Sequence, residues 1–224
     1  DIPFEDLQRD YDAIAITAGA MNPVYLDVPG ADLDGVKYGI DFMKLANLGQ
    51  ELAVGRNVVV IGGGYTAMDC SRTSLRYGAE NVTIAYRRTR SELVVDEEEL
   101  GETEREGVNL EFLVSPMELL GEDGRLTGVR FIRNKLGEPD ASGRRSPVPI
   151  PGSEFVVPAD TVIPAVSQAA DLSFLPVEAA FETIAAAAEA GITVFDTARA
   201  YNGNEELLAR ALRGCGAEGR ARIV

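Results

Sequence analysis

The chain has 224 residues, of which 46% are hydrophobic and 25% charged, and its 36 acidic side chains outnumber its 21 basic ones for a net charge of −15. This composition predicts a globular protein and argues against binding to nucleic acid or to an anionic membrane, because both need basic patches. Histidine is absent, which excludes a Ser-His-Asp triad, a Cys-His nucleophile pair and a histidine-ligated zinc site within these residues.

Few features of the sequence bear on the cellular location of the protein. The two cysteines, Cys70 and Cys215, lie far apart without a CxxC spacing, as expected of reduced thiols rather than of disulfides or iron–sulfur ligands. No apolar run is long enough for a transmembrane helix, and the first residues lack the basic start of a signal peptide. We therefore expect a soluble cytoplasmic protein.

The first part of the chain predicts alternating helices and strands. Residues 4–9 predict a helical turn, and the apolar run over 12–18 predicts a buried strand that ends at Gly19. Apolar positions at helical spacing predict a helix over 38–54. Residues 57–61 are β-branched without polar alternation, which is typical of a parallel strand covered on both faces.

A strand–turn–helix–strand unit begins at this run. The glycines at 62–64 follow it directly, and the next residues predict a helix over 65–77 and a second buried strand over 81–86. The acidic stretch over 91–106 is interpreted as a solvated helix face. The alternative, a metal site, usually draws its hard ligands from several segments.

The second half of the chain changes its pattern twice. Residues 110–157 predict an antiparallel β meander inserted in the α/β scaffold, with a hairpin turn over 121–124 and a polar loop over 137–143. Residues 160–166 predict a further buried strand. Beyond Pro176 the composition shifts, and the predicted elements are a helix over 178–190, a strand over 192–195, a helix over 204–212 and a strand over 221–224.

The glycine turn carries the main chemical signal. Residues 62–67, Gly-Gly-Gly-Tyr-Thr-Ala, fit the pattern G-x-G-x-x-A between a strand and a helix. Gly62 permits the turn, Gly64 lets a pyrophosphate approach the backbone, and small Ala67 permits close packing of helix on strand. The helix N-terminus offers N–H groups to the phosphates. A plain tight turn is the alternative, but the surrounding elements favour a dinucleotide site.

The end of the second strand bears on which dinucleotide binds. It reads Tyr86-Arg87-Arg88-Thr89-Arg90, with no acid before Glu92, whereas an NAD site usually places an Asp or Glu there for the ribose hydroxyls. Guanidinium groups match a 2′-phosphate in charge and geometry. This favours NADP(H) over NAD(H). Alternatively, the arginines solvate a loop or pair with the acidic helix that follows.

Three segments carry a family resemblance. VVVIGGGYTAMDCSRTSLRYGAENVTIAYRRTR, LGEPDASGRRSPVPIPGSEF and ADTVIPAVSQAADLSFLP resemble the NAD(P)H:FAD oxidoreductase module of the glutamate synthase small subunit, and also the flavin- and NADPH-binding portion of dihydropyrimidine dehydrogenase. The resemblance covers residues 5–176. It implies two nested Rossmann-like domains, one for FAD and one for NADPH, with hydride passing to the flavin and electrons leaving through an iron–sulfur partner.

The resemblance also implies roles for individual residues. The pyrophosphate would be held by Gly62, Gly64, Tyr65, Thr66 and Ala67, and the 2′-phosphate by Arg87, Arg88 and Arg90. The nicotinamide side would be lined by Ala165, Val166 and Ser167, although relatives usually have glycine at 167. Gly19, in the segment Thr17-Ala18-Gly19-Ala20, would pass near FAD, with the Thr-Ala order swapped relative to the usual form.

The family's main FAD anchors, an N-terminal strand–GxGxxG–helix unit and a later Gly-Asp pair, do not occur in this sequence. We therefore expect an α/β chain with a flavin-domain remnant over 1–51, an NADPH-binding Rossmann-like domain over 52–166, a return segment over 167–177 and a separate fragment over 178–224. We expect NADPH to bind, and FAD not to bind stably to this chain alone.

The last segment resembles a second family. AGITVFDTARAYNGNEELLARALRG is similar to the aldo-keto reductases, which are NADPH-dependent (β/α)8 barrels, and Asp196 and Tyr201 match their catalytic Asp and Tyr. The partner lysine and histidine are missing, since no lysine follows Lys135. Roughly one and a half of eight β/α units are present. We expect a partial barrel fragment without reductase activity.

These observations predict an NADPH-dependent flavin oxidoreductase module that passes electrons to an iron–sulfur partner. No side chain need act as acid or base in it, because the nicotinamide and the flavin carry the chemistry. The alternatives are a non-catalytic NADP-binding fragment, an aldo-keto-reductase-like fusion fragment, and an assembly piece whose open sheet edges need a partner.

Overall fold

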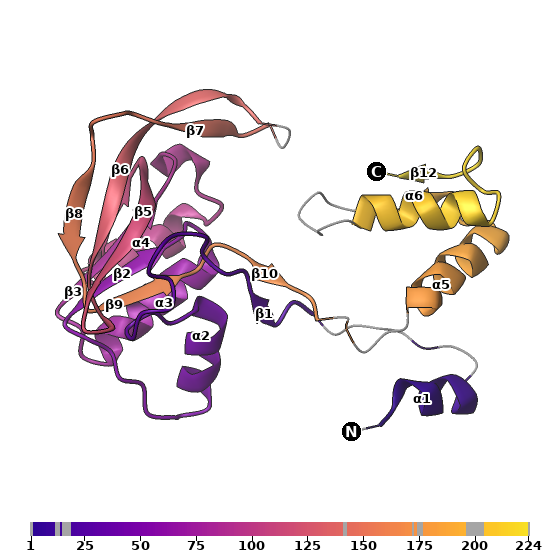
Figure 1. The fold of residues 1–224 in the computed structure, drawn as a ribbon, viewed down its shortest axis with the longest axis horizontal. Coiled ribbons are helices and arrows are strands. Elements are labelled where there is room, and N and C mark those ends of the chain that lie inside the picture. The colour runs from indigo at the N-terminus through magenta and orange to yellow at the C-terminus, as the bar shows by residue number, and fades with distance from the viewer. Residues whose placement is uncertain are drawn as a thin grey trace. The chain divides into compact units, whose positions relative to one another are not determined.

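A computed structural model of the chain describes residues 2–11, 14, 19–140, 143–171, 173, 177–195 and 204–223, and Figure 1 shows its elements. The chain divides into two compact units. Unit 1 comprises residues 1–21 and 169–224, and unit 2 comprises residues 22–168. The division into four segments at residues 51, 166 and 177 remains a prediction. The glycine turn and the meander both lie in unit 2.

Unit 2 is built on a four-stranded parallel sheet with the order β4-β3-β2-β9. Its strands are β2 (Asn57–Ile61), β3 (Asn81–Tyr86), β4 (Asn109–Phe112) and β9 (Thr161–Pro164). In the central strand, Val60 pairs with Ile84 on one side and with Ile163 on the other. This confirms the strands predicted over 57–61 and 81–86 and the strand within 160–166, and it makes unit 2 an α/β fold.

Alternate residues of the same strands pack in two separate hydrophobic cores. On one face Val58 and Val60 of β2 pack in a cluster with Met68, beneath the helices α2 (Gly39–Asn47), α3 (Tyr65–Arg76) and α4 (Glu97–Arg105), the last preceded by the 3-10 turn η1 (Arg90–Glu92). On the other face Val59 and Ile61 pack in a cluster with Phe131 of the meander. Because strand side chains alternate between faces, the unbroken apolar run of β2 is needed on both.

The second layer is the antiparallel meander. Its strands are β5 (Val114–Glu122), β6 (Arg125–Pro139), β7 (Arg145–Pro149) and β8 (Phe155–Pro158), and β6 pairs with each of the others. In Figure 1 the long strands β5 and β6 run side by side. Asp123 and Gly124 turn the β5–β6 hairpin with φ of 51° and 78°, which suits a tight two-residue turn.

Three sequence predictions are corrected. The helix expected over 38–54 ends at Asn47, because Gly49 takes a φ of 65° there and a left-handed glycine closes a helix. Residues 110–112 belong to β4, which pairs with β3 in the parallel sheet, rather than to the meander. Strand β6 continues to Pro139, so the loop expected over 137–143 begins later.

Unit 1 contains most of the remaining elements. They are α1 (Phe4–Asp10), α5 (Val177–Glu189), α6 (Asn204–Gly214), β11 (Val194–Phe195) and β12 (Arg222–Ile223). Strands β11 and β12 are parallel with α6 between them in the chain, so the helices and strands predicted beyond Pro176 form, while a barrel is not shown. The strand predicted over 12–18 lies outside the described residues, apart from Ile14. The short strand β1 (Asn22–Pro23) belongs to unit 2, and β10 (Gln168–Ala169) spans the boundary between the two units.

No helix among the described residues is long and apolar enough to cross a membrane.

Burial in the sheet makes a direct stability prediction. Ile163 in β9 is 0% exposed, and Ile163→Ala should lower the free energy of unfolding by about 2–5 kcal/mol through lost burial and a cavity. Ile150, which follows β7, is 39% exposed, and Ile150→Ala should cost less than about 1 kcal/mol. Urea unfolding of both variants checks this, and equal losses would contradict the burial of β9.

Candidate nucleotide-binding site

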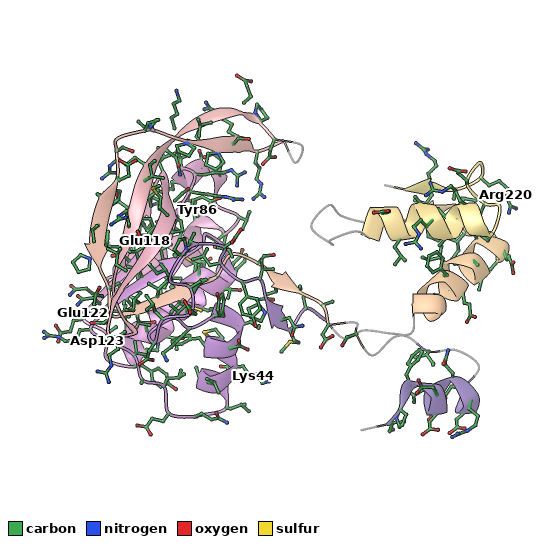
Figure 2. The ribbon with its side chains drawn as sticks, viewed as in Figure 1. Lys44, Tyr86, Glu118, Glu122, Asp123 and Arg220 are labelled. Atoms are coloured by element: carbon green, nitrogen blue, oxygen red, sulfur yellow. The ribbon has the colours of Figure 1, made fainter. Side chains whose placement is uncertain are left out.

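A cavity of about 580 Å³ opens at the carboxyl ends of the parallel strands in unit 2. Its walls come from the turn after β2, the end of β3, the residues after β9, the start of β5 and part of α2. Tyr86, labelled in Figure 2, ends β3 and lines it. In open parallel sheets, ligands bind in the crevice outside the carboxyl ends of the strands, so the cavity has the position expected of a ligand site.

The three glycines of the turn after β2 differ in the space around them. A Cβ on Gly62 would lie 2.4 Å from the carbonyl oxygen of Ala165, and a Cβ on Gly63 would lie 2.4 Å from a ring carbon of Tyr86. A Cβ on Gly64 would meet its nearest neighbour, Val94, only at 3.8 Å. The first two glycines are therefore required by the fold, whereas Gly64 leaves open space at the cavity wall.

Helix α3 begins directly after Gly64, and its N-terminus carries no side-chain cap and no acidic residue in the first turn. The Gly64 carbonyl accepts the N–H of Ala67 at 2.9 Å, and Thr66 lines the cavity. An uncapped N-terminus presents free N–H groups and partial positive charge, which together suit a phosphate.

Of the two other predicted pyrophosphate residues, Ala67 is buried and Tyr65 is exposed. Ala67 is 0% exposed in the core beneath the helices, which is the packing role that the fingerprint assigns to it. The ring of Tyr65 is exposed, and its hydroxyl donates to Asp96 at 3.0 Å. Asp96 also accepts the N–H of Glu99 as the N-cap of α4, and these two bonds, that of Glu99 first, lower the pKa of Asp96.

Arg87 is the first of the three predicted 2′-phosphate ligands. It lines the cavity and is exposed, and its guanidinium makes no hydrogen bond or ion pair with any residue that the structure describes. Desolvation at the cavity wall, followed by the charge of Arg88, lowers the pKa of Arg87, and Arg144 adds to this. Arg87 therefore keeps its donors available for an anion.

The other two arginines are engaged within the protein. Arg88 also lines the cavity but is 2% exposed, and it donates to the Arg145 carbonyl at 2.7 Å and to Asp140 at 2.8 Å. Arg90 donates to Glu104 at 2.8 Å and to Glu97 at 3.2 Å. Arg90 thus pairs with the acidic helix, as the alternative interpretation of the sequence proposed.

The wall opposite the arginines is formed by the residues after β9. Ala165 and Ser167 both line the cavity, and the Ala165 N–H donates to Ile61 at 2.8 Å, which holds the segment beside the glycine turn. The Ser167 carbonyl accepts the N–H of Val24 at 3.2 Å. The structure thus brings Gly62, Gly64, Thr66, Arg87, Arg88, Ala165 and Ser167 to one cavity.

Sequence reasoning missed three polar residues of the cavity, which are Ser115, Arg144 and Gln168. The Gln168 side chain reaches Thr66 Oγ1 at 3.4 Å, and its place next to Ser167 was a usable signal. Arg144 follows the polar loop of the meander, and no local pattern indicates that this loop returns to the parallel sheet.

Val166, predicted together with Ala165 and Ser167, also lines the cavity. Asp196 and Tyr201 lie outside the described residues, as do Thr17 and Ala18. Gly19 belongs to unit 1 and has a φ of 67°.

The acidic stretch behaves as a charged helix face rather than as a metal site. Arg72 contacts Glu99 at 2.7 Å and Glu106 at 2.6 Å, and Arg76 contacts Glu106 at 2.9 Å. Within the described part of the chain, no group of three acidic or cysteine residues could hold a metal ion.

The fold and the cavity define an α/β unit that is covered by a β meander and has a cavity at the carboxyl ends of its parallel strands. The family model for pyridine nucleotide-disulphide oxidoreductases matches residues 5–197. The chain belongs to the pyridine nucleotide-disulphide oxidoreductase family.

Named relatives agree with this family. The chain is 48% identical over 180 residues to the NADPH-Fe(3+) oxidoreductase subunit beta of Geobacter sulfurreducens, covering 79% of this chain and 27% of that protein. It is 39% identical over 176 residues to the glutamate synthase [NADPH] small chain of Escherichia coli, covering 73% of this chain and 37% of that protein. The chain thus spans about a quarter to just over a third of these relatives.

Solved structures share the fold. The Mycobacterium tuberculosis protein FprA in complex with NADPH matches with a TM-score of 0.63 and 21% identity, covering 75% of this chain and 52% of that one. Thioredoxin reductase from T. acidophilum matches with a TM-score of 0.52 and 16% identity, covering 90% of this chain and 62% of that one. These matches give no support to the aldo-keto reductase resemblance of the last segment.

Alanine substitutions at two neighbouring glycines of the turn should lower the free energy of unfolding by different amounts. Gly63→Ala should lower the free energy of unfolding by about 1–3 kcal/mol, because its methyl group overlaps the Tyr86 ring. Gly64→Ala should change it by less than about 1 kcal/mol, because its methyl group enters open space. Thermal unfolding of the two variants distinguishes them, and a large loss for Gly64→Ala would show that the wall at Gly64 is closed.

Proposed function

We propose that unit 2 binds NADPH and that the chain is the NADPH-binding part of a flavin oxidoreductase. The observation that carries this is the meeting of an uncapped helix N-terminus, an open Gly64 and the available guanidinium of Arg87 at one cavity. In a chain with a net charge of −15, such a concentration of positive potential at the sheet's ligand crevice suits an anionic dinucleotide.

Each wall of the cavity would have its own part in binding. The N-terminus of α3 and the space at Gly64 would receive the pyrophosphate, and Arg87 would receive the 2′-phosphate, whose charge and oxygens a guanidinium matches. The wall of Ala165 and Ser167 would bound the nicotinamide end. Bound NADPH supplies the hydride, so the protein's task is to bind and align it.

The names of the relatives support this assignment. Those in G. sulfurreducens and E. coli carry NADPH in their names and are a subunit and a small chain. By analogy, we propose that this chain works within a larger enzyme, with FAD as the hydride acceptor and an iron–sulfur subunit as the next electron carrier.

Both described cysteines are free thiols, which agrees with a reducing compartment such as the cytoplasm.

FAD binding has a weaker structural basis than NADPH binding. The residues that line the cavity all belong to unit 2, whereas Gly19, which the resemblance assigns to the flavin, belongs to unit 1. This favours a second candidate function for the chain on its own, which is NADP binding without hydride transfer.

The visible absorption spectrum of the purified chain separates the two functions. A flavin band that bleaches on anaerobic addition of NADPH would support the oxidoreductase. A colourless protein that enhances NADPH fluorescence would support the binding function alone. A colourless protein that binds no NADPH would contradict both.

Arg87 should set the preference for NADPH. Arg87→Ala should raise the Kd for NADPH about 10-fold or more, since a charge-assisted hydrogen bond contributes about 1.5–3 kcal/mol, and should leave the Kd for NADH little changed. Fluorescence titration with both nucleotides measures this. Arg125→Ala on β6 removes the same charge away from the cavity and is the matched control. Equal losses for the two nucleotides would reject the 2′-phosphate assignment.

Gly64→Ala should act on the part that both nucleotides share. Its methyl group enters the space proposed for the pyrophosphate, so the variant should remain folded and lose affinity for NADPH and NADH alike, by about 10-fold or more. The same titrations measure it. Unchanged affinities would place the pyrophosphate elsewhere.

A further inference from the structure

The carbonyl groups of Arg87 and Arg88 are held by residues far along the chain, one just before the meander and one within it. The Arg88 carbonyl accepts the N–H of Leu113 at 3.1 Å, and the Arg87 carbonyl accepts the side-chain amide of Asn134 at 3.3 Å. Asn134 is 3% exposed, and its amide also donates to Ser115 at 2.8 Å. The segment that presents Arg87 therefore depends on contacts from outside the parallel sheet.

The Arg88 side chain extends this connection to the turn between β6 and β7. Its guanidinium binds Asp140 before that turn and the Arg145 carbonyl after it. The turn is closed by its own backbone bonds, since the Asp140 N–H donates to the Arg144 carbonyl at 2.7 Å and the Gly143 N–H donates to the Asp140 carbonyl at 2.9 Å. One buried guanidinium thus anchors both sides of the turn.

Arg145 fixes the turn on strand β6. Its side chain donates to the Gly137 carbonyl at 3.1 Å and to the Leu136 carbonyl at 3.0 Å. Of the described residues between Asp140 and Arg145, Arg144 is the one that lines the cavity.

Arg144 is exposed and lines the same cavity as Arg87 and Arg88. Its positive charge, like that of Arg88, lowers the pKa of Arg87, while Asp140 raises it. Cations gathered at one site repel one another, and an anion placed among them relieves this repulsion. A phosphate monoester carries a charge of about −1.5 to −2 at neutral pH, so it calls for more than one cation.

We propose that Arg144 is a second specificity-determining residue for the 2′-phosphate of NADPH, and that the Arg88–Asp140 ion pair is the positioning contact that brings it to the cavity. This inference rests on the proposed function. It assigns part of the nucleotide preference to the meander, and it gives Arg88 a role through Asp140 in addition to any contact with the phosphate.

The first test replaces Arg144. Arg144→Ala should raise the Kd for NADPH about 10-fold and leave the Kd for NADH within about 2-fold, because only NADPH carries the 2′-phosphate. Arg144→Lys keeps the charge but not the planar fork, so its Kd for NADPH should lie between those of the wild type and Arg144→Ala. Arg125→Ala on the same meander is the matched control and should match the wild type. Because Arg144 is exposed, thermal unfolding should show all three variants folded.

The second test uses Asp140→Asn to separate positioning from simple charge. If Asp140 acted only as a negative charge near the phosphate, its removal would tighten NADPH binding. If it positions Arg144 through Arg88, the variant should bind NADPH a few-fold more weakly and NADH unchanged. Tighter NADPH binding would therefore overturn the positioning role.

The outcomes separate this inference from the proposed function. If the wild-type chain binds no NADPH, both fail. If it binds NADPH and Arg87→Ala weakens binding while Arg144→Ala does not, the proposed function stands and this inference is overturned. Equal losses for NADPH and NADH in Arg144→Ala would also overturn it, since the residue would then act on the shared part of the nucleotide.

Discussion

Burial of both faces of the parallel strands β2, β3 and β9 is the constraint on which unit 2 depends. Val58 and Val60 face the helices, while Val59 and Ile61 face the meander, so one short strand joins two hydrophobic cores. The same strand ends in the glycine turn, and its position therefore fixes where α3 begins. The cavity lies where these two layers meet at the carboxyl edge of the sheet, which is why residues from both contribute to it.

The electrostatics of the cavity follow from how the surrounding charges are used. The chain is strongly acidic, yet no described carboxylate lines the cavity. Carboxylates on and beside α4 are engaged, since Asp96 caps α4 and Glu97 and Glu104 bind Arg90. The helix N-terminus and Arg87 are left without such partners among the described residues. Positive potential at the cavity thus results from pairing elsewhere, and the net charge of the chain does not reveal it.

The sequence was sufficient for strands β2 and β3 and for the glycine turn, because both are encoded by local patterns. The β-branched runs at 57–61 and 81–86 and the G-x-G-x-x-A turn needed no tertiary information. The different environments of Arg88, Arg90 and Arg144 could not be predicted without tertiary information. A row of arginines looks uniform in sequence, but burial beside Asp140, pairing with α4 and exposure at the cavity are decided by which distant segments return to the end of β3.

Placing a phosphate-facing arginine on the turn between two meander strands has an evolutionary consequence. Surface turns accept changes of length and sequence more readily than buried parallel strands do, and β2, β3 and β9 are buried almost throughout. A lineage of such proteins could therefore shift between phosphorylated and unphosphorylated dinucleotides by remodelling residues 140–145 while its sheet remained unaltered. The anchor formed by Arg88 would limit which remodelled turns still reach the cavity.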